Sequence, residues 1–229
     1  MPNLFFGKKE NDEIILDKQE TAHLKIMRKK ENEQLDAFIN DGKIYKCIIK
    51  KISSKNTILK INEIREQKLN FKPNINLYFG ISKVDRMNLL IEKAVEMRIN
   101  TINIYKGEKS TINYKNEDKI KKTAIQAAKQ SYLSKIPDIN IINFKEIVLN
   151  DNTIAFDFSE NYSMEENLKN DIQEINLLFG PDMGFSDNEK KILNKSNIPI
   201  INLGKTIFRF ETSIFYVLSI INYKYRRLL

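Results

Sequence analysis

The sequence predicts an α/β protein in which a small β-rich module precedes a larger, mainly parallel sheet. From residue 75 onward, short apolar runs alternate with helix-like patterns, which is typical of a parallel sheet covered by helices on both faces. Residues 1–72 instead hold short apolar runs separated by turn signals. A chain of 229 residues fits one large domain or two small ones, at roughly 100–200 residues per domain. We expect two domains, 1–72 and 73–229.

Composition narrows the class of protein. Hydrophobic residues make up 41% of the chain, and no apolar run approaches the ~20 residues of a membrane span. Residues 1–9 lack the charged start and long apolar centre of a signal peptide. The single cysteine, Cys47, lies in a strand-like run where packing is its expected role, and it suits a reducing cytoplasm. One cysteine and one histidine argue against a zinc site. We expect a cytoplasmic protein that uses neither a metal nor a membrane.

The charge balance favours a polyanionic partner. The net charge is +8 and the pI is near 9.3, and residues 1–72 carry more than half of the excess. The alternative is a general compositional bias, because the chain is rich in Lys, Asn and Ile throughout. The uneven distribution favours nucleic acid as the partner.

The first module reads as a meander or a small barrel. A strand at 12–16 precedes a helix at 19–27 that carries the only histidine, His23. Further strands are predicted at 35–39, 44–49 and 58–61. The Asp41-Gly42 pair is typical of a tight hairpin turn. Residues 69–74 read as a linker.

The second part alternates strands and helices in order. Asp85 and Asn116 are expected to cap the first two helices, each of which has one apolar stripe. The second of these helices extends to Ser131 and ends before Pro137. The predicted strands are 75–81, 101–105, 139–142, 153–158, 172–179 and 198–202, and a last helix spans 212–227.

The first of two glycine loops ends the strand 172–179 at Gly180-Pro181. Ser186 has Glu189 three residues later, which is the reciprocal pairing of a capping box. This pattern predicts a helix that begins near Asp187.

The second loop, Leu203-Gly204, also stands between an apolar run and a helix-like pattern. Two strand-to-helix loops at one edge of a parallel sheet expose backbone N–H and C=O groups around a crevice. Small ligands bind in such crevices. Either loop alone reads as an ordinary turn, whereas the pair indicates a binding site.

The two loops closely resemble those of the SPOUT superfamily of S-adenosylmethionine-dependent RNA methyltransferases, and within it the RsmE family. The first matching segment is Gly180-Pro181-Asp182-Met183-Gly184-Phe185-Ser186 with Glu189; the second is Leu203-Gly204 with Ile207-Phe208-Arg209-Phe210-Glu211-Thr212. Weaker matches follow in order along nearly the whole chain: His23-Leu24 with Met27-Arg28, Lys83 with Asp85-Arg86-Met87, Glu92 to Glu96, Glu108-Lys109-Ser110, and Gln126 to Ser131.

The chain departs from the family pattern at four positions. Asp182 replaces a glutamate and Met183 a glycine in the first loop. Arg98 stands where the family usually has glycine, and Leu133 where it usually has arginine.

The resemblance implies a fold and a reaction. Residues 1–72 would form a PUA-like RNA-binding β-barrel, and 73–229 a SPOUT methyltransferase domain whose C-terminal part is a trefoil knot. The family acts as a homodimer and methylates ring nitrogen 3 of a uridine in 16S ribosomal RNA. Its methyl donor is S-adenosylmethionine, no metal is needed, and the assembled small subunit is the implied substrate.

The cofactor site is expected where the two loops and the end of strand 153–158 meet. Glycines there let the backbone approach the ligand, and apolar side chains supply the walls. The expected residues are Phe158, Ser159, Phe179, Gly180, Pro181, Gly184, Ile201, Leu203, Gly204, Ile207, Phe208 and Arg209.

Two residues are the candidates for catalysis. Arg209 carries a permanent charge on a planar fork, which suits a uracil carbonyl as negative charge spreads onto it; a phosphate contact or a pair with Glu211 are the alternatives. Glu211 has two readings: it accepts the proton or steers Arg209, or it only favours the start of the last helix. The general base stays unassigned.

RNA contacts are expected from basic and polar residues in both parts of the chain. Arg28 and Lys29 belong to a basic cluster that suits phosphates, although a charge run is often only a solvated face. The full set is His23, Arg28, Lys29, Lys83, Arg86 and Gln130.

Two other functions fit parts of the pattern. One is another SPOUT methyltransferase that acts on transfer RNA or on a ribose 2′-hydroxyl. The other is a non-catalytic RNA-binding or ribosome-assembly protein that kept the fold. Binding of S-adenosylmethionine separates this last reading from the enzymes.

Overall fold

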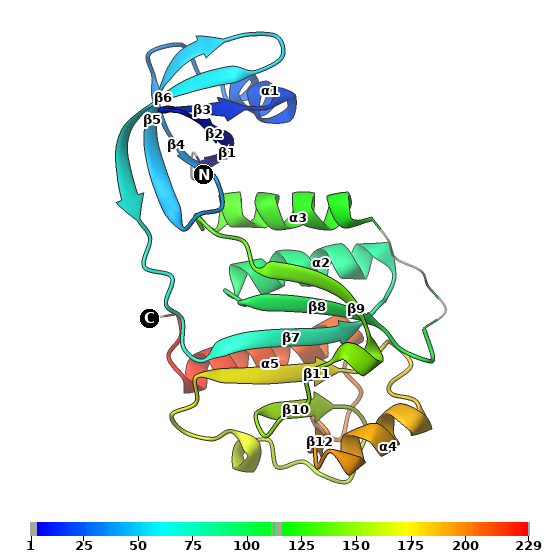
Figure 1. Cartoon of the computed structure of the whole chain (residues 1–229). Coiled ribbons are helices and arrows are strands. Elements are labelled where there is room, and N and C mark those ends of the chain that lie inside the picture. The colour runs from blue at the N-terminus through cyan, green and yellow to red at the C-terminus, as the bar shows by residue number, and fades with distance from the viewer. Residues whose placement is uncertain (1–3, 111, 113–115, 229) are drawn as a thin grey trace. The chain divides into compact units, whose positions relative to one another are not determined.

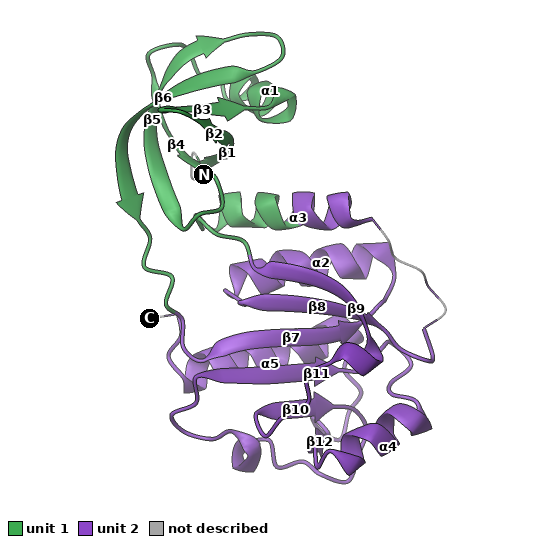
Figure 2. Ribbon diagram, in the orientation of Figure 1, with its two compact units in different colours: residues 1–70, 124–136 green, residues 71–123, 137–229 purple. Residues whose placement is uncertain are grey.

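The chain folds into two compact units in the computed structural model, which describes residues 4–110, 112 and 116–228 (Figures 1 and 2). The first unit comprises residues 1–70 and 124–136, and the second comprises 71–123 and 137–229. Helix α3 (Glu117–Gln130) therefore begins in the second unit and ends in the first. The sequence analysis assigned all of 124–136 to the second part.

The first unit is built on a six-stranded sheet with the order β1-β4-β5-β6-β3-β2. Only the pair β1–β4 is parallel; the other pairs that the structure describes in this sheet are antiparallel. Its elements are β1 (Leu4–Phe6), β2 (Lys8–Glu10), β3 (Glu13–Leu16), α1 (Lys18–Ile26), β4 (Gln34–Phe38), β5 (Lys43–Ile52) and β6 (Thr57–Glu66).

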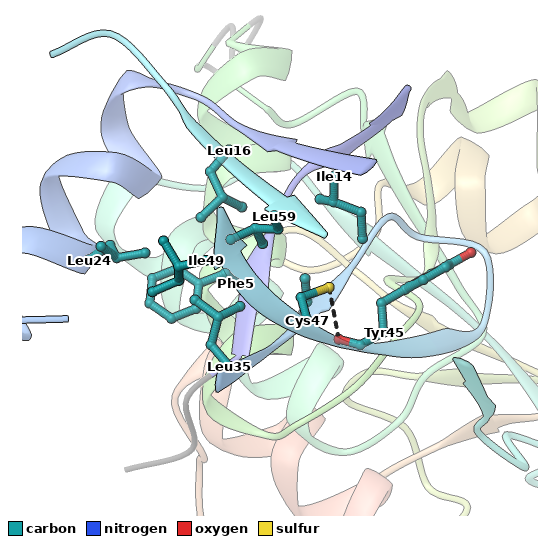
Figure 3. Packing of buried hydrophobic residues seen from close by; sticks show 10 residues of the cluster. Phe5, Ile14, Leu16, Leu24, Leu35, Tyr45, Cys47, Ile49 and Leu59 are labelled. Atoms are coloured by element: carbon teal, nitrogen blue, oxygen red, sulfur yellow. Dashed lines mark hydrogen bonds between the residues drawn. The ribbon is translucent and has the colours of Figure 1, made fainter. Parts of the chain in front are cut away.

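The first unit encloses an apolar core. Two shifts in register between β5 and β6 mark bulges, which bend and twist a strand pair so that it can curl around side chains. Figure 3 shows side chains from the strands and from α1 pointing toward one another. The buried cluster contains Phe5, Ile14, Leu16, Leu24, Leu35, Ala37, Tyr45, Cys47, Ile49 and Leu59.

Within the first unit, residues 124–136 contact the N-terminal residues 1–70 through polar side chains. The ammonium of Lys129 lies 2.6 Å from Glu20 Oε1 in a buried ion pair. The hydroxyl of Tyr132 donates to Asp36 at 2.6 Å, and the side chain of Gln67 donates to the carbonyl of Tyr132 at 2.8 Å. These partners are distant in the sequence, which is why the sequence analysis did not find them.

The second unit is built on a six-stranded sheet with the order β12-β10-β11-β7-β8-β9. Every strand pair that the structure describes in this sheet is parallel, as predicted. Its strands are β7 (Asn74–Gly80), β8 (Thr101–Lys106), β9 (Asp138–Asn143), β10 (Thr153–Phe156), β11 (Glu174–Phe179) and β12 (Ile200–Ile201).

The inner strands of this sheet are buried on both faces: consecutive residues, which point to opposite faces, are buried in β7, β8, β10 and β11, whereas the edge strand β9 is partly exposed. Tyr78 and Leu178 belong to a cluster that includes Leu193 of α4. Phe79 lies in β7 next to Tyr78, and its ring makes an edge contact with Phe210 of α5 at 6.4 Å. The helices are α2 (Val84–Glu96), α3, α4 (Asp187–Lys195) and α5 (Phe210–Lys224), with short 3₁₀ turns at Phe144–Glu146 and Glu165–Asn167.

The observed N-termini of the helices can be compared with the capping residues predicted from the sequence. Ser186 caps α4 within a capping box with Glu189, as predicted. Asn116 accepts a hydrogen bond from the Lys119 N–H at 3.0 Å, which fits its predicted capping role. The prediction for Asp85 was wrong: α2 begins at Val84, so Asp85 lies inside the first turn, where its charge favours the helix dipole.

Several predicted boundaries also moved. Ser131 lies just beyond α3, and α5 begins two residues before the predicted start. The linker ends earlier, because Asn74 already belongs to β7. Strands β1 and β2 were not predicted, since three residues on either side of Gly7 are too few to show a period.

No helix within the described ranges is long and apolar enough to cross a membrane.

The reactivity of Cys47 reports whether the first unit is folded. It is buried, and burial, with a smaller contribution from Asp36, raises the pKa of its thiol to about 12. We predict that a disulfide reagent at pH 8 leaves Cys47 unmodified until the protein unfolds, because only the thiolate reacts. Measuring the thiol groups that react with the disulfide reagent in native and in urea-unfolded protein checks this. Rapid labelling of the native protein would contradict it.

Candidate functional site

A pocket of about 700 Å³, including the space at its open mouth, lies at the carboxyl ends of β10, β11 and β12. This is the edge at which open α/β sheets bind ligands. Nine of the twelve residues predicted for the cofactor line it: Phe158, Phe179, Gly180, Pro181, Gly184, Ile201, Leu203, Ile207 and Phe208. Ser159, Gly204 and Arg209 are outside this lining. The sequence analysis missed Phe156, Asp157, Asp182, Asn202, Thr206, Phe210 and Ser213.

The first glycine loop turns on Gly184. Its φ is +69°, and a Cβ there would lie 2.9 Å from Asp157 Oδ1, so the position requires glycine both for its backbone conformation and for its close contact. The Asp157 carboxylate accepts hydrogen bonds from the N–H groups of Phe158 at 2.8 Å and Phe185 at 3.1 Å. Lys190 lies 3.0 Å from the same carboxylate. Asp157 thus joins the end of β10 to the loop.

Pro181 packs directly against two other glycines. A Cβ on Gly80, at the end of β7, or on Gly107, just after β8, would lie 2.7 Å from atoms of Pro181. Such a distance is too short for non-bonded carbon atoms, so neither position can carry a side chain while the loop stays in place. The loop is therefore seated on the ends of β7 and β8.

Residues 108 and 109, which follow Gly107, also hold the loop and the start of α4. The ammonium of Lys109 donates to the carbonyl of Phe185 at 2.7 Å. Glu189 is buried and accepts from the N–H groups of Glu108 at 2.9 Å and Ser186 at 2.7 Å. The Ser186 hydroxyl donates to Glu108 Oε2 at 2.6 Å. The capping box predicted from the sequence thus also connects α4 to this segment.

The second loop presents apolar side chains to solvent. Ile207 is 80% exposed and Phe208 37% exposed, and Phe158 across the pocket is 61% exposed. Exposed apolar groups of this size are typical of binding surfaces. Gly204 has a φ of +145°, a conformation that L side chains rarely adopt.

Arg209 is the N-cap residue of α5 and is exposed. Within the described ranges its guanidinium has no carboxylate partner. Glu211 does not pair with it; the nearest cation is Arg86, whose Nε lies 3.7 Å from Glu211 Oε2. The alternative in which Arg209 pairs with Glu211 is therefore absent from this structure.

The six residues predicted to contact RNA fall in both units. His23, Arg28, Lys29 and Gln130 belong to the first unit, and Lys83 and Arg86 to the second. His23 is exposed, and its Nδ1 lies 3.3 Å from the ammonium of Lys129. A hydrogen bond between these two atoms requires the neutral ring with its proton on Nε2, because an ammonium only donates. Lys29 forms an ion pair with Glu33 at 3.2 Å.

The four departures from the family pattern are accommodated. Met183 is 73% exposed and is not part of the pocket lining, so its side chain does not fill the pocket. Asp182 binds Ser82 and Arg86. Arg98 has a φ of +60°, which explains why glycine suits this position, and its guanidinium lies over the ring of Phe71. Leu133 is buried.

The pocket offers backbone groups and apolar walls rather than metal ligands. In residues 4–110, 112 and 116–228, no group of three or more His, Cys, Asp or Glu side chains could hold a metal ion. The glycine turns allow close approach of a flat ligand, and the stacked rings of Phe156 and Phe179, 4.7 Å apart, form one wall. Such a site suits an adenosine-containing ligand.

Matches to protein-family models define the class of protein to which this chain belongs. Residues 69–222 match the model described as an RNA methyltransferase domain, and residues 16–62 match the RNA methyltransferase PUA domain. The chain is therefore an RNA methyltransferase domain with an attached PUA domain.

Comparison with individual relatives identifies the family within this class. The chain is 31% identical over 203 residues to the ribosomal RNA small subunit methyltransferase E of Buchnera aphidicola subsp. Acyrthosiphon pisum, covering 82% of this chain and 79% of the relative. The chain belongs to the ribosomal RNA small subunit methyltransferase E family. This confirms the family resemblance predicted from the sequence.

Solved structures agree on the fold. A predicted RNA methyltransferase of Thermotoga maritima has a TM-score of 0.85 and 28% identity, covering 99% of this chain and 100% of the other. A ribosomal RNA small subunit methyltransferase E of Neisseria gonorrhoeae, bound to S-adenosyl methionine, has a TM-score of 0.85 and 20% identity, covering 97% of each chain.

The contribution of Ser186 to stability, as the cap of α4 and as a partner of Glu108, can be measured. We predict that Ser186→Ala lowers the free energy of unfolding by about 1–2 kcal/mol, because it removes the helix cap and the bond to Glu108. Urea unfolding measures the loss. Ser219→Ala is the control: this hydroxyl is exposed in α5 and donates only to the carbonyl one turn earlier, so the expected change is within about 0.5 kcal/mol. Equal effects of the two changes would contradict the supporting role.

Proposed function

We propose that this protein methylates ring nitrogen 3 of a uridine in the 16S ribosomal RNA of the small subunit, with S-adenosylmethionine as the methyl donor. The observation that carries the proposal is the pocket between the two glycine loops, with Arg209 beside it at the start of α5. Family membership supports RNA methylation, and the names of the relatives support the small-subunit substrate.

The pocket is the proposed cofactor site. Phe156, Phe158 and Phe179 would pack against the adenosine, and the backbone around Gly180 and Leu203 would bind its polar groups. S-adenosylmethionine supplies an electrophilic methyl group on its sulfonium sulfur. The protein's contribution is to hold the acceptor nitrogen near that methyl group and to exclude water.

Arg209 is the proposed catalytic residue. Ring nitrogen 3 of uridine lies between two carbonyl groups, and it must lose its proton for the methyl group to be transferred. The negative charge then spreads onto the carbonyl oxygens, where a guanidinium stabilises it. Arg209 is available for this role because no carboxylate among the described residues pairs with it.

Glu211 is proposed to support the site rather than to take the proton. Its carboxylate faces Arg86, and it lies in the first turn of α5, where negative charge is stabilising.

Residues 1–72 are proposed to bind RNA as a PUA-like barrel, with 73–229 as the catalytic domain. The matched ranges 16–62 and 69–222 support a boundary near residue 70. His23, Arg28, Lys29, Lys83 and Gln130 are the proposed RNA contacts. His23 would act through its Nε2–H, because Lys129 occupies Nδ1.

We further propose a cytoplasmic homodimer whose C-terminal part is threaded as a trefoil knot. The exposed apolar groups Ile207, Phe208 and Tyr216 support burial of this region against a second copy. Analytical ultracentrifugation is expected to give twice the mass of the 26.9 kDa chain, and a monomer at micromolar concentration would contradict the dimer. A crystal structure in which the traced backbone is unthreaded would contradict the knot.

The reaction is tested by methyl transfer from labelled S-adenosylmethionine to small subunits from cells lacking this protein, with nucleosides identified by mass spectrometry. We predict 3-methyluridine with the wild type and a loss of about 100-fold or more in rate with Arg209→Ala, the effect expected for removing one charge-stabilising donor. Arg226→Ala, which removes an exposed arginine near the chain end, is the control and should retain activity.

The outcomes separate the alternatives. A different methylated nucleoside would keep the cofactor site but move the substrate to another RNA or to a ribose hydroxyl. No transfer and no binding of S-adenosylmethionine would leave an RNA-binding or ribosome-assembly role. An Arg209→Ala protein as active as the wild type would remove Arg209 from the mechanism.

A further inference from the structure

Arg86 lies between two carboxylates: Asp182, which lines the pocket, and Glu211, which follows the lining residue Phe210. Its Nη1 is 2.9 Å from Asp182 Oδ2, and its Nε is 3.7 Å from Glu211 Oε2. Asp182 belongs to the first glycine loop, whereas Glu211 follows the second loop in the first turn of α5. Arg86 itself is in the first turn of α2. One side chain of the second unit thus connects three segments around the pocket.

The contact with Asp182 fixes the first loop. Asp182 lines the pocket, and its Oδ2 also accepts a hydrogen bond from the buried hydroxyl of Ser82 at 2.8 Å. Two donors on one oxygen restrict the carboxylate. The backbone at Asp182, which lies between Pro181 and Gly184 of the pocket wall, is restricted with it.

The contact with Glu211 depends on charge alone. The Glu211 side chain is only 15% exposed, and its Oε2 has no hydrogen-bond donor among the residues described. A carboxylate buried in this way is costly unless a positive charge lies near it, and Arg86 supplies that charge. Glu211 is two residues after Arg209, the N-cap of α5. A shift of Glu211 would therefore move the proposed catalytic residue.

The chemistry of arginine suits a bridge of this kind. Its guanidinium presents Nη1 and Nε in a rigid plane, so two nitrogens can face two carboxylates at once. A lysine ammonium is a single point charge and cannot reproduce that geometry. Lys83, the N-cap of the same helix, is exposed and has no carboxylate partner within the described ranges. Of the two cations, Lys83 is therefore the one that remains available to an RNA phosphate.

We infer that Arg86 is a positioning residue of the methyl-donor site, which bridges Asp182 and Glu211 and so holds the two glycine loops and Arg209 in place. Arg86, which the sequence pattern predicted as an RNA contact, would then act within the cofactor site instead. This assignment rests on the proposed function, because it names what organises the site that the function requires.

Binding of S-adenosylmethionine in the absence of RNA tests the inference. Isothermal titration of the full-length protein compares the wild type with Arg86→Met, Arg86→Lys and Lys83→Met. We expect Arg86→Met to raise Kd about tenfold or more, which is about 1.4 kcal/mol, and Arg86→Lys to recover part of that loss. We expect Lys83→Met to bind the cofactor as the wild type does and to bind ribosomal RNA more weakly.

Two further measurements separate bridging from a general loss of structure. Urea unfolding shows whether each variant is folded under the assay conditions. Asp182→Asn removes one end of the bridge and leaves Arg86 in place, so it gives an independent comparison if Arg86→Met does not fold. We expect Asp182→Asn to raise Kd as well, and the double variant Arg86→Met/Asp182→Asn to be no worse than Arg86→Met alone.

An unchanged Kd for S-adenosylmethionine in folded Arg86→Met or Asp182→Asn, with RNA binding reduced, would overturn the inference and leave Arg86 as an RNA contact. Strictly additive effects of the two changes would also overturn it, because residues of one bridge are coupled. Failure of the wild type to bind S-adenosylmethionine would contradict the proposed function itself. The two failures are thus distinguished by the wild-type titration.

Discussion

The pocket depends on the close approach of the first glycine loop to the ends of two strands. Pro181 lies so near Gly80 and Gly107 that a single added carbon on either glycine would overlap it. Neither contact can relax by a side-chain rotation, because the crowded atoms are backbone and proline ring. The loop is therefore held at the carboxyl edge of the sheet, and Gly184 and the walls of the pocket take their positions from it.

Buried carboxylates then secure the loop. Asp157 and Glu189 each accept hydrogen bonds from two backbone N–H groups, so their charges are compensated by oriented dipoles. Arg86 adds a connection from the loop to the start of α5. A site that is organised in this way before the ligand arrives spends less binding energy on ordering.

Much of the second unit could be predicted because its signals are local. Apolar runs marked the parallel strands, and the spacing of Ser186 and Glu189 marked the start of α4. Most of the pocket lining followed from the two glycine loops. The features that were missed depend on contacts between distant segments. Nothing in the neighbourhood of Asp157, Gly80 or Gly107 in the sequence shows that each meets the first loop, and the buried pair of Glu20 with Lys129 joins residues 109 positions apart. Only the folded chain reveals these contacts.

The pocket at the ends of β10, β11 and β12 is the proposed methyl-donor site. A crystal structure of the protein with S-adenosylhomocysteine tests this assignment. We expect the ligand to lie between Gly180 and Leu203 with its adenosine against Phe179, while Arg86 contacts both Asp182 and Glu211. Ligand bound at another place, with this pocket filled only by solvent at saturating concentration, would contradict it.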